Sequence, residues 1–288
     1  MLLYLVILGA VAAWRFLPRK WEPTTFLETS HYAISSTATP EQTAAMGRAA
    51  ETLYEAYHEL FSTMPGYEPY HPKLKVHLYK DRDELRRINP GLGWAEAFYR
   101  KPESHAYSAA SESNPFHWML HEVVHQLNEE VAHLDLEHWL EEGLAEYLGT
   151  SRFTDGKLRF GTIDPYTYPV WWLSSIAMEG DLTKDLAEGS VIPLRAIITN
   201  QGGPAMSTHV NLYYLHWWSL AHYVFEKHPA VAKDLIINRG TLEAFERLIG
   251  PVEQVQPQWH AHVLRIKAAL HDRHFQATGE LPPESPRP

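Results

Sequence analysis

The segment His121-Glu122-Val123-Val124-His125 constrains this chain more than any other, because it specifies both a local structure and a chemistry. Residues four apart lie on one face of an α-helix, so His121 and His125 can place two imidazole nitrogens on one metal ion. Glu122 lies about 100° further round the helix and can polarise a water on that ion without ligating it. Two imidazoles, an open water position and a carboxylate make up most of a hydrolytic zinc site. The segment therefore predicts a helix that carries part of such a site.

The composition limits the classes of site and partner. The chain has no cysteine, so only histidine and carboxylate side chains can hold a metal ion. Its 18 histidines raise the chance that the motif arises by accident, so the motif needs support from its surroundings. With 288 residues, 45% of them hydrophobic, the chain can form one large domain or two packed lobes. A net charge of −10 argues against nucleic acid as a partner, because the summed field does not attract a polyanion.

An uncharged apolar run over residues 2–14 is the only targeting signal. Its length suits the hydrophobic part of a signal peptide and is short for a membrane span, and Ala10-Val11-Ala12 is a candidate cleavage site. No basic residue precedes the run and three follow it, so an uncleaved anchor would keep its C-terminal side in the cytoplasm. We expect residues 1–20 to be a signal peptide or membrane anchor. The expected location is extracytoplasmic, periplasmic or secreted, with membrane association through residues 2–17 if the segment is not cleaved.

Strand and helix patterns alternate after residue 21. Thr39 is followed by Pro40 and then by Gln42, which is a capping box opening a helix that reaches Phe61. Asp81 caps a short helix that ends near residue 89. Four segments have the composition or alternation of strands: 25–35, 74–79, 95–99 and 104–110.

Two helices are expected around and after the histidine motif. Asn114-Pro115 opens the first as cap and first residue, and residues 116–129 carry the motif. The second covers residues 137–148, where Glu142 and Glu146 are four apart and share a face. Taken alone, these carboxylates are better explained as a solvated acidic edge. Together with the histidine motif, a functional role for these carboxylates becomes the favoured explanation.

The two helices together resemble those of the gluzincin metallopeptidases, in particular bacterial peptidase-MA-like domains, which read HExxHQL and then WLxEGLAEY. This resemblance implies that Glu142, seventeen positions after His125, is the third zinc ligand. It also implies that Glu146 holds a ligand histidine by its other ring nitrogen, which fixes the tautomer. Weaker similarity covers most of the chain after residue 21. The matching residues are His121, Glu122, His125, Gln126 and Leu127 in the first helix and Trp139, Leu140, Glu142, Gly143, Leu144, Ala145, Glu146 and Tyr147 in the second.

The resemblance also implies a fold and a domain organisation. The expected fold is α+β and zincin-like, with a small mixed sheet and the active-site helices followed by a mainly helical second lobe. In residue ranges, the α/β lobe covers 21–150, the helical lobe covers 151–275, and a flexible tail covers 276–288.

Other ligand plans can be compared with the sequence. His117 is four residues before His121 on the same stripe, but Trp118 follows it where a catalytic pair would need Glu, so we interpret His117 as structural or at the cleft rim. A metzincin would need Gly at position 128 and His at position 131. The chain has Asn128 and Val131, so that plan fails.

An aspzincin plan stays open as the alternative. Such proteins take the third ligand from a GTxDxxYG motif, and Gly161-Thr162-Ile163-Asp164 matches its first half, although Tyr168 is one place late. Asp164 is therefore the alternative third ligand. Four further residues between or at the start of the helices are within reach of the metal but fit no known frame as well as Glu142: His133, Asp135, Glu137 and His138.

The rest of the chain is expected to form a loop and then helices. Residues 151–172 are rich in Gly, Pro, Thr and Tyr and predict a loop over the cleft. In gluzincins a Tyr or His downstream of the zinc helices commonly stabilises the oxyanion of the tetrahedral intermediate. The candidates here are Tyr214, Tyr213 and His216, in that order. Helices are expected over residues 212–226, 230–238, 241–248 and 257–271.

These observations predict a zinc-dependent peptidase that acts on peptide or protein substrates. His121, His125 and Glu142 would hold Zn²⁺, and Glu122 would take a proton from the attacking water and pass it to the leaving amine. An edge strand among residues 95–110 would let an extended peptide pair with its backbone. The alternatives are an aspzincin-type peptidase using Asp164 and a zinc-binding scaffold without catalysis, since metal ligands contribute folding energy either way. Glu122 favours an enzyme, because a structural zinc site needs no base.

Overall fold

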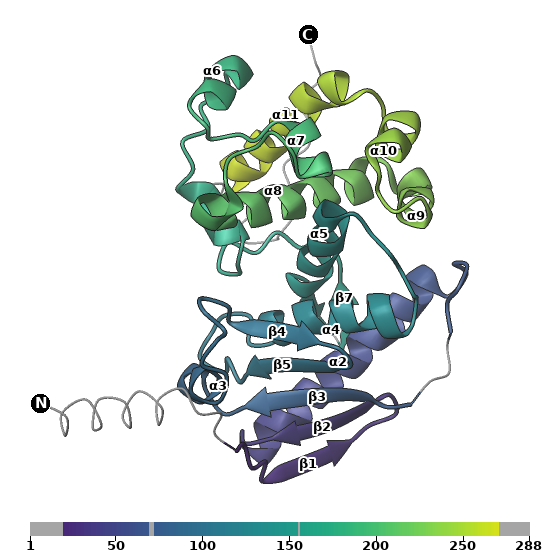
Figure 1. Ribbon diagram of the computed structural model, residues 1–288, viewed down its shortest axis with the longest axis vertical. Coiled ribbons are helices and arrows are strands. Elements are labelled where there is room, and N and C mark those ends of the chain that lie inside the picture. The colour runs from purple at the N-terminus through teal and green to yellow at the C-terminus, as the bar shows by residue number, and fades with distance from the viewer. Residues whose placement is uncertain (1–19, 69–71, 155, 271–288) are drawn as a thin grey trace, which may run out of the picture.

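The computed structural model describes residues 20–68, 72–154 and 156–270 (Figure 1). These residues form an α+β fold, as expected. Residues 1–19, which contain the predicted signal peptide or anchor, and 276–288, the predicted tail, lie outside the described ranges. Within those ranges, no helix has the length and apolar character needed to cross a bilayer.

A mixed five-stranded sheet forms the lower part of the molecule in Figure 1. Strands β2, β3 and β5 run parallel, while β1 and β4 pair antiparallel at the two ends, in the order β1-β2-β3-β5-β4. The single strand predicted over residues 25–35 is wrong, because Thr29 bonds to Tyr32 across a turn that divides this segment into two strands. The bounds are β1 Thr25–Glu28, β2 Tyr32–Ser36, β3 Leu74–Tyr79, β4 Ala97–Arg100 and β5 Glu103–Tyr107.

Two predicted helix starts are confirmed. Helix α2 spans Pro40–Phe61, and both halves of the capping box form between Thr39 and Gln42. Helix α3 spans Arg82–Ile88, and the Asp81 side chain accepts a hydrogen bond from the backbone of its first turn. Each cap satisfies backbone N–H groups that a helix leaves without partners at its start, which is why these local signals predict the boundaries well.

The sheet has an inner and an outer face. On β3, Leu74, Val76 and Leu78 are buried in the main core with α2, as the alternating pattern predicts. The alternate residues of β3 face the other way. There Tyr79, at the end of the strand, packs in a small second cluster with Leu85 of α3. Successive side chains of a strand point to opposite faces, so the register of the parallel strands decides which side chains meet on each face.

Helices α4 (His117–Glu130) and α5 (His138–Gly149) follow the sheet and lie between it and the helices of the later part of the chain. The start of α4 differs from the prediction: Phe116 is the cap residue without a side-chain hydrogen bond, and Asn114 does not cap the helix. Two glycines let α5 pack closely on both sides. A Cβ at Gly149 would lie 3.3 Å from the backbone of His121, and one at Gly143 would lie 2.8 Å from the carbonyl oxygen of Trp217.

The chain after residue 151 is mostly helical. Residues 151–172 are not the plain loop that was predicted, because they contain a hairpin of β6 and β7 and lead into a 3₁₀ turn. The predicted helices are present with shifted ends, and α11 accommodates Pro257 inside it. The bounds are β6 Arg152–Thr154, β7 Lys157–Arg159, η1 Val170–Ser174, α6 Leu182–Ala187, α7 Leu194–Thr199, α8 Met206–Lys227, α9 Pro229–Ile237, α10 Leu242–Leu248 and α11 Val252–Ala269.

One apolar core connects the sheet and the helices. It includes Val76 of β3, Val123 of α4, Leu144 of α5 and Trp217 of α8, all at most 1% exposed. Burial of this kind is the main favourable contribution to folding. The core therefore fixes α4 and α5 between the sheet and α8.

Buried neutral histidines make the fold sensitive to acid. His216 is fully enclosed in α8, where its Nδ1 donates to the carbonyl of Leu212 at 2.6 Å and its Nε2 accepts from the backbone N–H of Ile192 at 3.3 Å. Burial lowers the pKa of His216 to about 4. A proton on Nε2 would remove the acceptor for Ile192, so the folded state requires the neutral imidazole.

We expect the free energy of unfolding to fall as the pH drops from 6.5 towards 4, because in this window the unfolded chain binds a proton at His216 and the folded chain does not. His216 should contribute about 1.4 kcal/mol per pH unit to this slope. Urea unfolding at several pH values measures it, with a smaller slope in His216→Gln. The exposed His209 of the same helix is the control position. Equal slopes in wild type and His216→Gln would contradict this account.

Candidate metal centre

Helix α4 places the two histidines of the motif together at the cleft. The Nε2 atoms of His121 and His125 are 3.0 Å apart, and the two ring planes are inclined by 77°. Both side chains are largely buried, with 9% and 13% of their surface exposed. Rings that meet at a steep angle can direct both Nε2 lone pairs to one point, so the pair can chelate a single ion.

Glu142 of α5 completes a triangle with these two nitrogens. Its Oε2 atom is 3.4 Å from Nε2 of His121 and 3.7 Å from Nε2 of His125. Together with the 3.0 Å separation of the nitrogens, these sides leave a central point about 2.0 Å from each atom, close to the length of a zinc bond to nitrogen or oxygen. Glu142 Oε2 is buried and has no hydrogen-bond partner among the described residues. The donor set and this orphaned oxygen fit a zinc ion.

Glu122 lies beside this triangle. One of its carboxylate oxygens is within 4.8 Å of a ring nitrogen of both histidines. Only 8% of the residue is exposed, and burial raises the pKa of Glu122 above its ordinary value, against the opposing effect of His121 and His125. A carboxylate whose pKa is raised towards neutrality is suited to general base catalysis.

The charges of the cluster also fit a cation. Burial alone would raise the pKa of Glu142, but His125 and His121 outweigh it and lower that pKa to about 2. Burial would likewise lower the pKa of His121, yet the surrounding glutamates, first of all Glu146, raise it to about 10. The carboxylates thus favour positive charge at this position, which a divalent ion can supply once it displaces protons from its ligands.

Each of the two histidines also has a carboxylate near its Nδ1 atom. Glu146, 1% exposed, has an oxygen 3.4 Å from Nδ1 of His121, although no hydrogen bond forms between the two. Nδ1 of His125 donates to Glu141 at 2.7 Å, and Asn128 donates to the same Glu141 oxygen at 3.2 Å. Tyr57 of α2 in turn donates to Asn128 at 2.7 Å. A proton fixed on Nδ1 leaves the Nε2 lone pair free for a metal.

Glu141 was not among the residues singled out from the sequence. Its position next to Glu142 was a signal that could have identified Glu141. Adjacent helix residues lie about 100° apart, so both can face the same neighbouring helix. Its partner could not be read from that signal, since His125 is sixteen residues earlier on another helix.

The three candidates for the oxyanion partner have different surroundings. Tyr214 lines the cleft, and its ring centroid is 6.2 Å from that of His121. Burial, followed by the effect of Glu142, raises the pKa of Tyr214 above its ordinary value, so it keeps a proton to donate. The hydroxyl of Tyr213 donates instead to the carbonyl of Pro204, and both nitrogens of His216 bond to the backbone. Tyr214 therefore stays the candidate, as ranked.

His117 and the residues between the two helices take other roles. His117 is 2% exposed, its Nε2 is 3.7 Å from Glu146, and burial lowers its pKa to about 3. Its burial fits the structural interpretation. Asp135 lies at the edge of the cleft and pairs with Arg239, while the ring of His138 packs on Trp217.

Asp164 is engaged away from the triangle. It is 5% exposed, forms an ion pair with Arg152 at 2.5 Å, and accepts a hydrogen bond from Thr167. It is not among the described residues that line the cleft. The geometry thus brings Glu142, and not Asp164, to the histidines.

A cleft of about 560 Å³ opens over the cluster. Its walls include Ala97, Phe98 and Tyr99 of β4 as well as the triangle and Glu122. Strand β4 is the last in the sheet order and pairs only with β5 among the described strands. The backbone of Tyr99 in this strand forms a hydrogen bond to the carboxylate of Glu122. The volume lies within the usual range for ligand sites, about 300–1,000 Å³.

Comparison with known protein families gives no match for this chain, and no curated protein is significantly similar to it. The assignment of a function therefore depends on the residues and geometry described above.

The ligand plan can be tested by metal content. We expect Glu142→Ala to lower zinc occupancy by about tenfold or more, because it removes one of three ligand atoms from the triangle. Asp164→Ala should leave the zinc content per folded chain unchanged. Plasma emission or mass spectrometry of the purified proteins measures both. The reverse outcome would identify Asp164 as the third ligand.

Proposed function

We propose that this protein is a zinc-dependent peptidase of the gluzincin type, with a zincin-like fold. The observation that carries the proposal is the triangle of His121 Nε2, His125 Nε2 and Glu142 Oε2, with sides of 3.0, 3.4 and 3.7 Å, beside the carboxylate of Glu122. The resemblance of the two helices to HExxHQL and WLxEGLAEY supports the same assignment.

In this proposal His121, His125 and Glu142 hold the ion. Zinc held there would supply Lewis acidity, which would polarise a substrate carbonyl and lower the pKa of a water, to about 7 in well-studied enzymes. The hydrogen bond from His125 to Glu141 and the contact of His121 with Glu146 orient the two imidazoles.

Glu122 acts as the proton carrier. Its carboxylate accepts a proton from the attacking water and then delivers that proton to the nitrogen of the leaving amine. Burial raises the pKa of Glu122 above its ordinary value, which favours the protonated form that follows the first step. The same carboxylate therefore serves first as base and then as acid.

Tyr214 donates a hydrogen bond to the oxygen that becomes negative when the carbonyl is attacked. Its position at the cleft, its burial and its raised pKa all favour a neutral phenol as the donor. Such a donor is preorganised, because the phenol is fixed in contact with the rings of Tyr168 and Trp217.

The substrate in this proposal is an extended peptide segment that pairs with the outer edge of β4. Backbone pairing supplies affinity that does not depend on sequence, and side chains that alternate along the strand enter the cleft. Nucleic acid is not proposed as a partner, because the net charge of −10 does not attract it. An extracytoplasmic location and membrane association through residues 2–17 stay proposals.

The second candidate function is a zinc-binding scaffold without catalysis, and the presence of Glu122 argues against it.

In Glu122→Gln we expect turnover of a peptide library to fall at least about 1,000-fold, since the base is lost, while zinc stays near one per chain. Glu59→Gln, on an exposed position of α2, is the control. Activity of Glu122→Gln at the wild-type level would refute the mechanism, and an inactive wild type with full zinc content would favour the scaffold.

Removal of the Tyr214 hydroxyl tests the oxyanion role. We expect Tyr214→Phe to lower kcat by about 100- to 1,000-fold with little change in KM, the loss seen when one oxyanion donor is removed. Tyr213→Phe is the matched control, because the Tyr213 hydroxyl bonds to Pro204 instead of facing the cleft. Equal kinetics for wild type and Tyr214→Phe would exclude Tyr214 from the reaction.

A further inference from the structure

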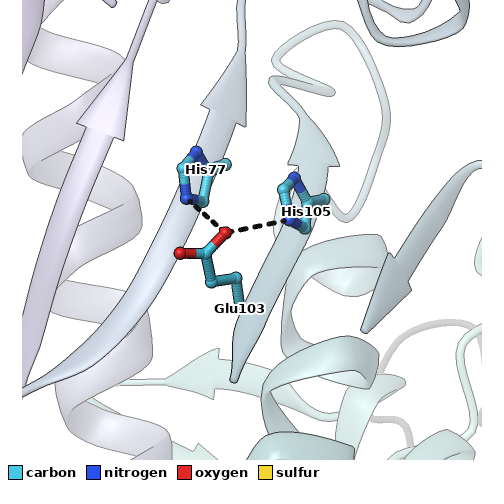
Figure 2. A group of neighbouring side chains, drawn as sticks. All are labelled: His77, Glu103 and His105. Carbon is cyan, nitrogen blue, oxygen red and sulfur yellow. Dashed lines mark ion pairs between the residues drawn. The ribbon is translucent and has the colours of Figure 1, made fainter. Parts of the chain in front are cut away.

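A second group of metal-ligating side chains lies on the outer face of the sheet. His77 projects from β3, and Glu103 and His105 project from the neighbouring β5 (Figure 2). The parallel register pairs His77 with His105 directly across the two strands. Strand register therefore brings together three ligand residues that are up to 28 positions apart in the chain.

One oxygen of Glu103 faces both imidazoles. Its Oε2 atom is 3.3 Å from Nε2 of His77 and 3.8 Å from Nε2 of His105, and in Figure 2 both dashed lines meet at this oxygen. All three ligand atoms lie within 4.8 Å of one another. Ligand atoms around a tetrahedral zinc ion are about 3.3 Å apart for bonds of about 2.0–2.1 Å, so the spacing is close to that of a site.

The spacing is wider than that of two hydrogen-bonded histidine–glutamate pairs of this protein and similar to that of the exposed His133–Glu68 contact at 3.6 Å. His31 contacts Glu51 at 2.6 Å, and His125 contacts Glu141 at 2.7 Å, as expected for charge-assisted hydrogen bonds. The group on β3 and β5 is held wider than these pairs. The Nδ1 atom of His105 bonds to the hydroxyl of Tyr79 at 3.2 Å, which leaves its Nε2 towards Glu103.

From this arrangement we propose that His77, Glu103 and His105 form a second metal site, for a divalent transition-metal ion of the zinc class. Two imidazole nitrogens and a carboxylate oxygen suit such an ion, and no thiolate is needed. Glu103 is about one-third exposed, so water can complete the coordination. The site is separate from the catalytic cleft, because it lies on the opposite face of the sheet from α4.

Coordination requires a local movement of His77. The rings of His77 and His105 are stacked, with an interplanar angle of 12°, and two parallel rings cannot both direct Nε2 to one ion. His105 is held between Tyr79 and the ring of Phe98. His77 makes no hydrogen bond through Nδ1 among the described residues, and its last side-chain torsion has broad preferences. To coordinate the ion, this ring would have to turn against the ring of Trp21, whose centroid is 5.0 Å away.

A metal ion at this position would connect β3 to β5. On its other face β5 carries Ser104, whose hydroxyl donates to the backbone carbonyl of Glu122 at 3.2 Å. The ion would therefore stabilise the strand that supports the helix of the first site. Lys75 contacts the other oxygen of Glu103 at 3.4 Å and competes with a cation for this carboxylate.

Zinc titration by calorimetry tests the site in a variant with His121→Ala and His125→Ala, which removes both imidazoles of the first centre. We expect one zinc per chain in this background, and affinity at least about tenfold weaker when Glu103→Gln or His77→Gln is added. Lys75→Gln should tighten zinc binding by about two- to fivefold, because it removes a competing cation. The effect is small because an exposed ion pair contributes little free energy. Thermal unfolding with and without zinc confirms that each variant folds and reports the same binding as a shift in Tm.

His31→Gln is the matched control, because it removes a histidine that pairs with a single glutamate. Its zinc affinity should equal that of the background. Binding that is unchanged by both Glu103→Gln and His77→Gln would show zinc held at other surface groups and overturn the proposal. So would the absence of any zinc binding in the background variant.

Discussion

The close packing of α4 against α5 is the constraint on which the rest of the structure depends. Gly149 lies so near the backbone of His121 that a Cβ there would be only 3.3 Å away, and on the far side Gly143 allows α8 the same approach. This spacing brings Glu142 of one helix within 3.4–3.7 Å of two imidazoles on the other. The triangle of His121, His125 and Glu142 is thus a product of helix packing, and the apolar core that continues from the sheet through α5 to α8 holds it in place.

Burial of unlike charges follows from that packing. Glu122, Glu142 and Glu146 are largely enclosed with His121 and His125. Burial raises the pKa of Glu146 to about 8, whereas His125 and His121 outweigh burial at Glu142 and lower its pKa to about 2. Desolvation of such a group is expensive unless the charges are compensated. A divalent ion would compensate these buried carboxylates. Glu122 would lie beside the ion and remain free to act as the base that we propose.

Local signals in the sequence predicted local features. Thr39 and Asp81 cap their helices as expected, and the alternation at Leu74, Val76 and Leu78 gives a strand with the expected inner face, because each depends on neighbours within a few residues. Asn114 was predicted as a cap and is not one, and residues 151–172 contain a hairpin. In the candidate site, helix periodicity placed His121 and His125 on one face, and the resemblance to a known family added Glu142. Glu141 with His125, and His77 with His105, were not predicted, since these contacts depend on helix packing and strand register.

We propose that one zinc ion lies between α4 and α5, held by His121, His125 and Glu142. Anomalous diffraction at the zinc absorption edge, from crystals of the wild-type protein grown with zinc, tests it directly. The account predicts a peak at the cleft, about 2.0–2.2 Å from Nε2 of each histidine and from a carboxylate oxygen of Glu142. A cleft without a peak, or a peak whose ligands exclude Glu142, would contradict it.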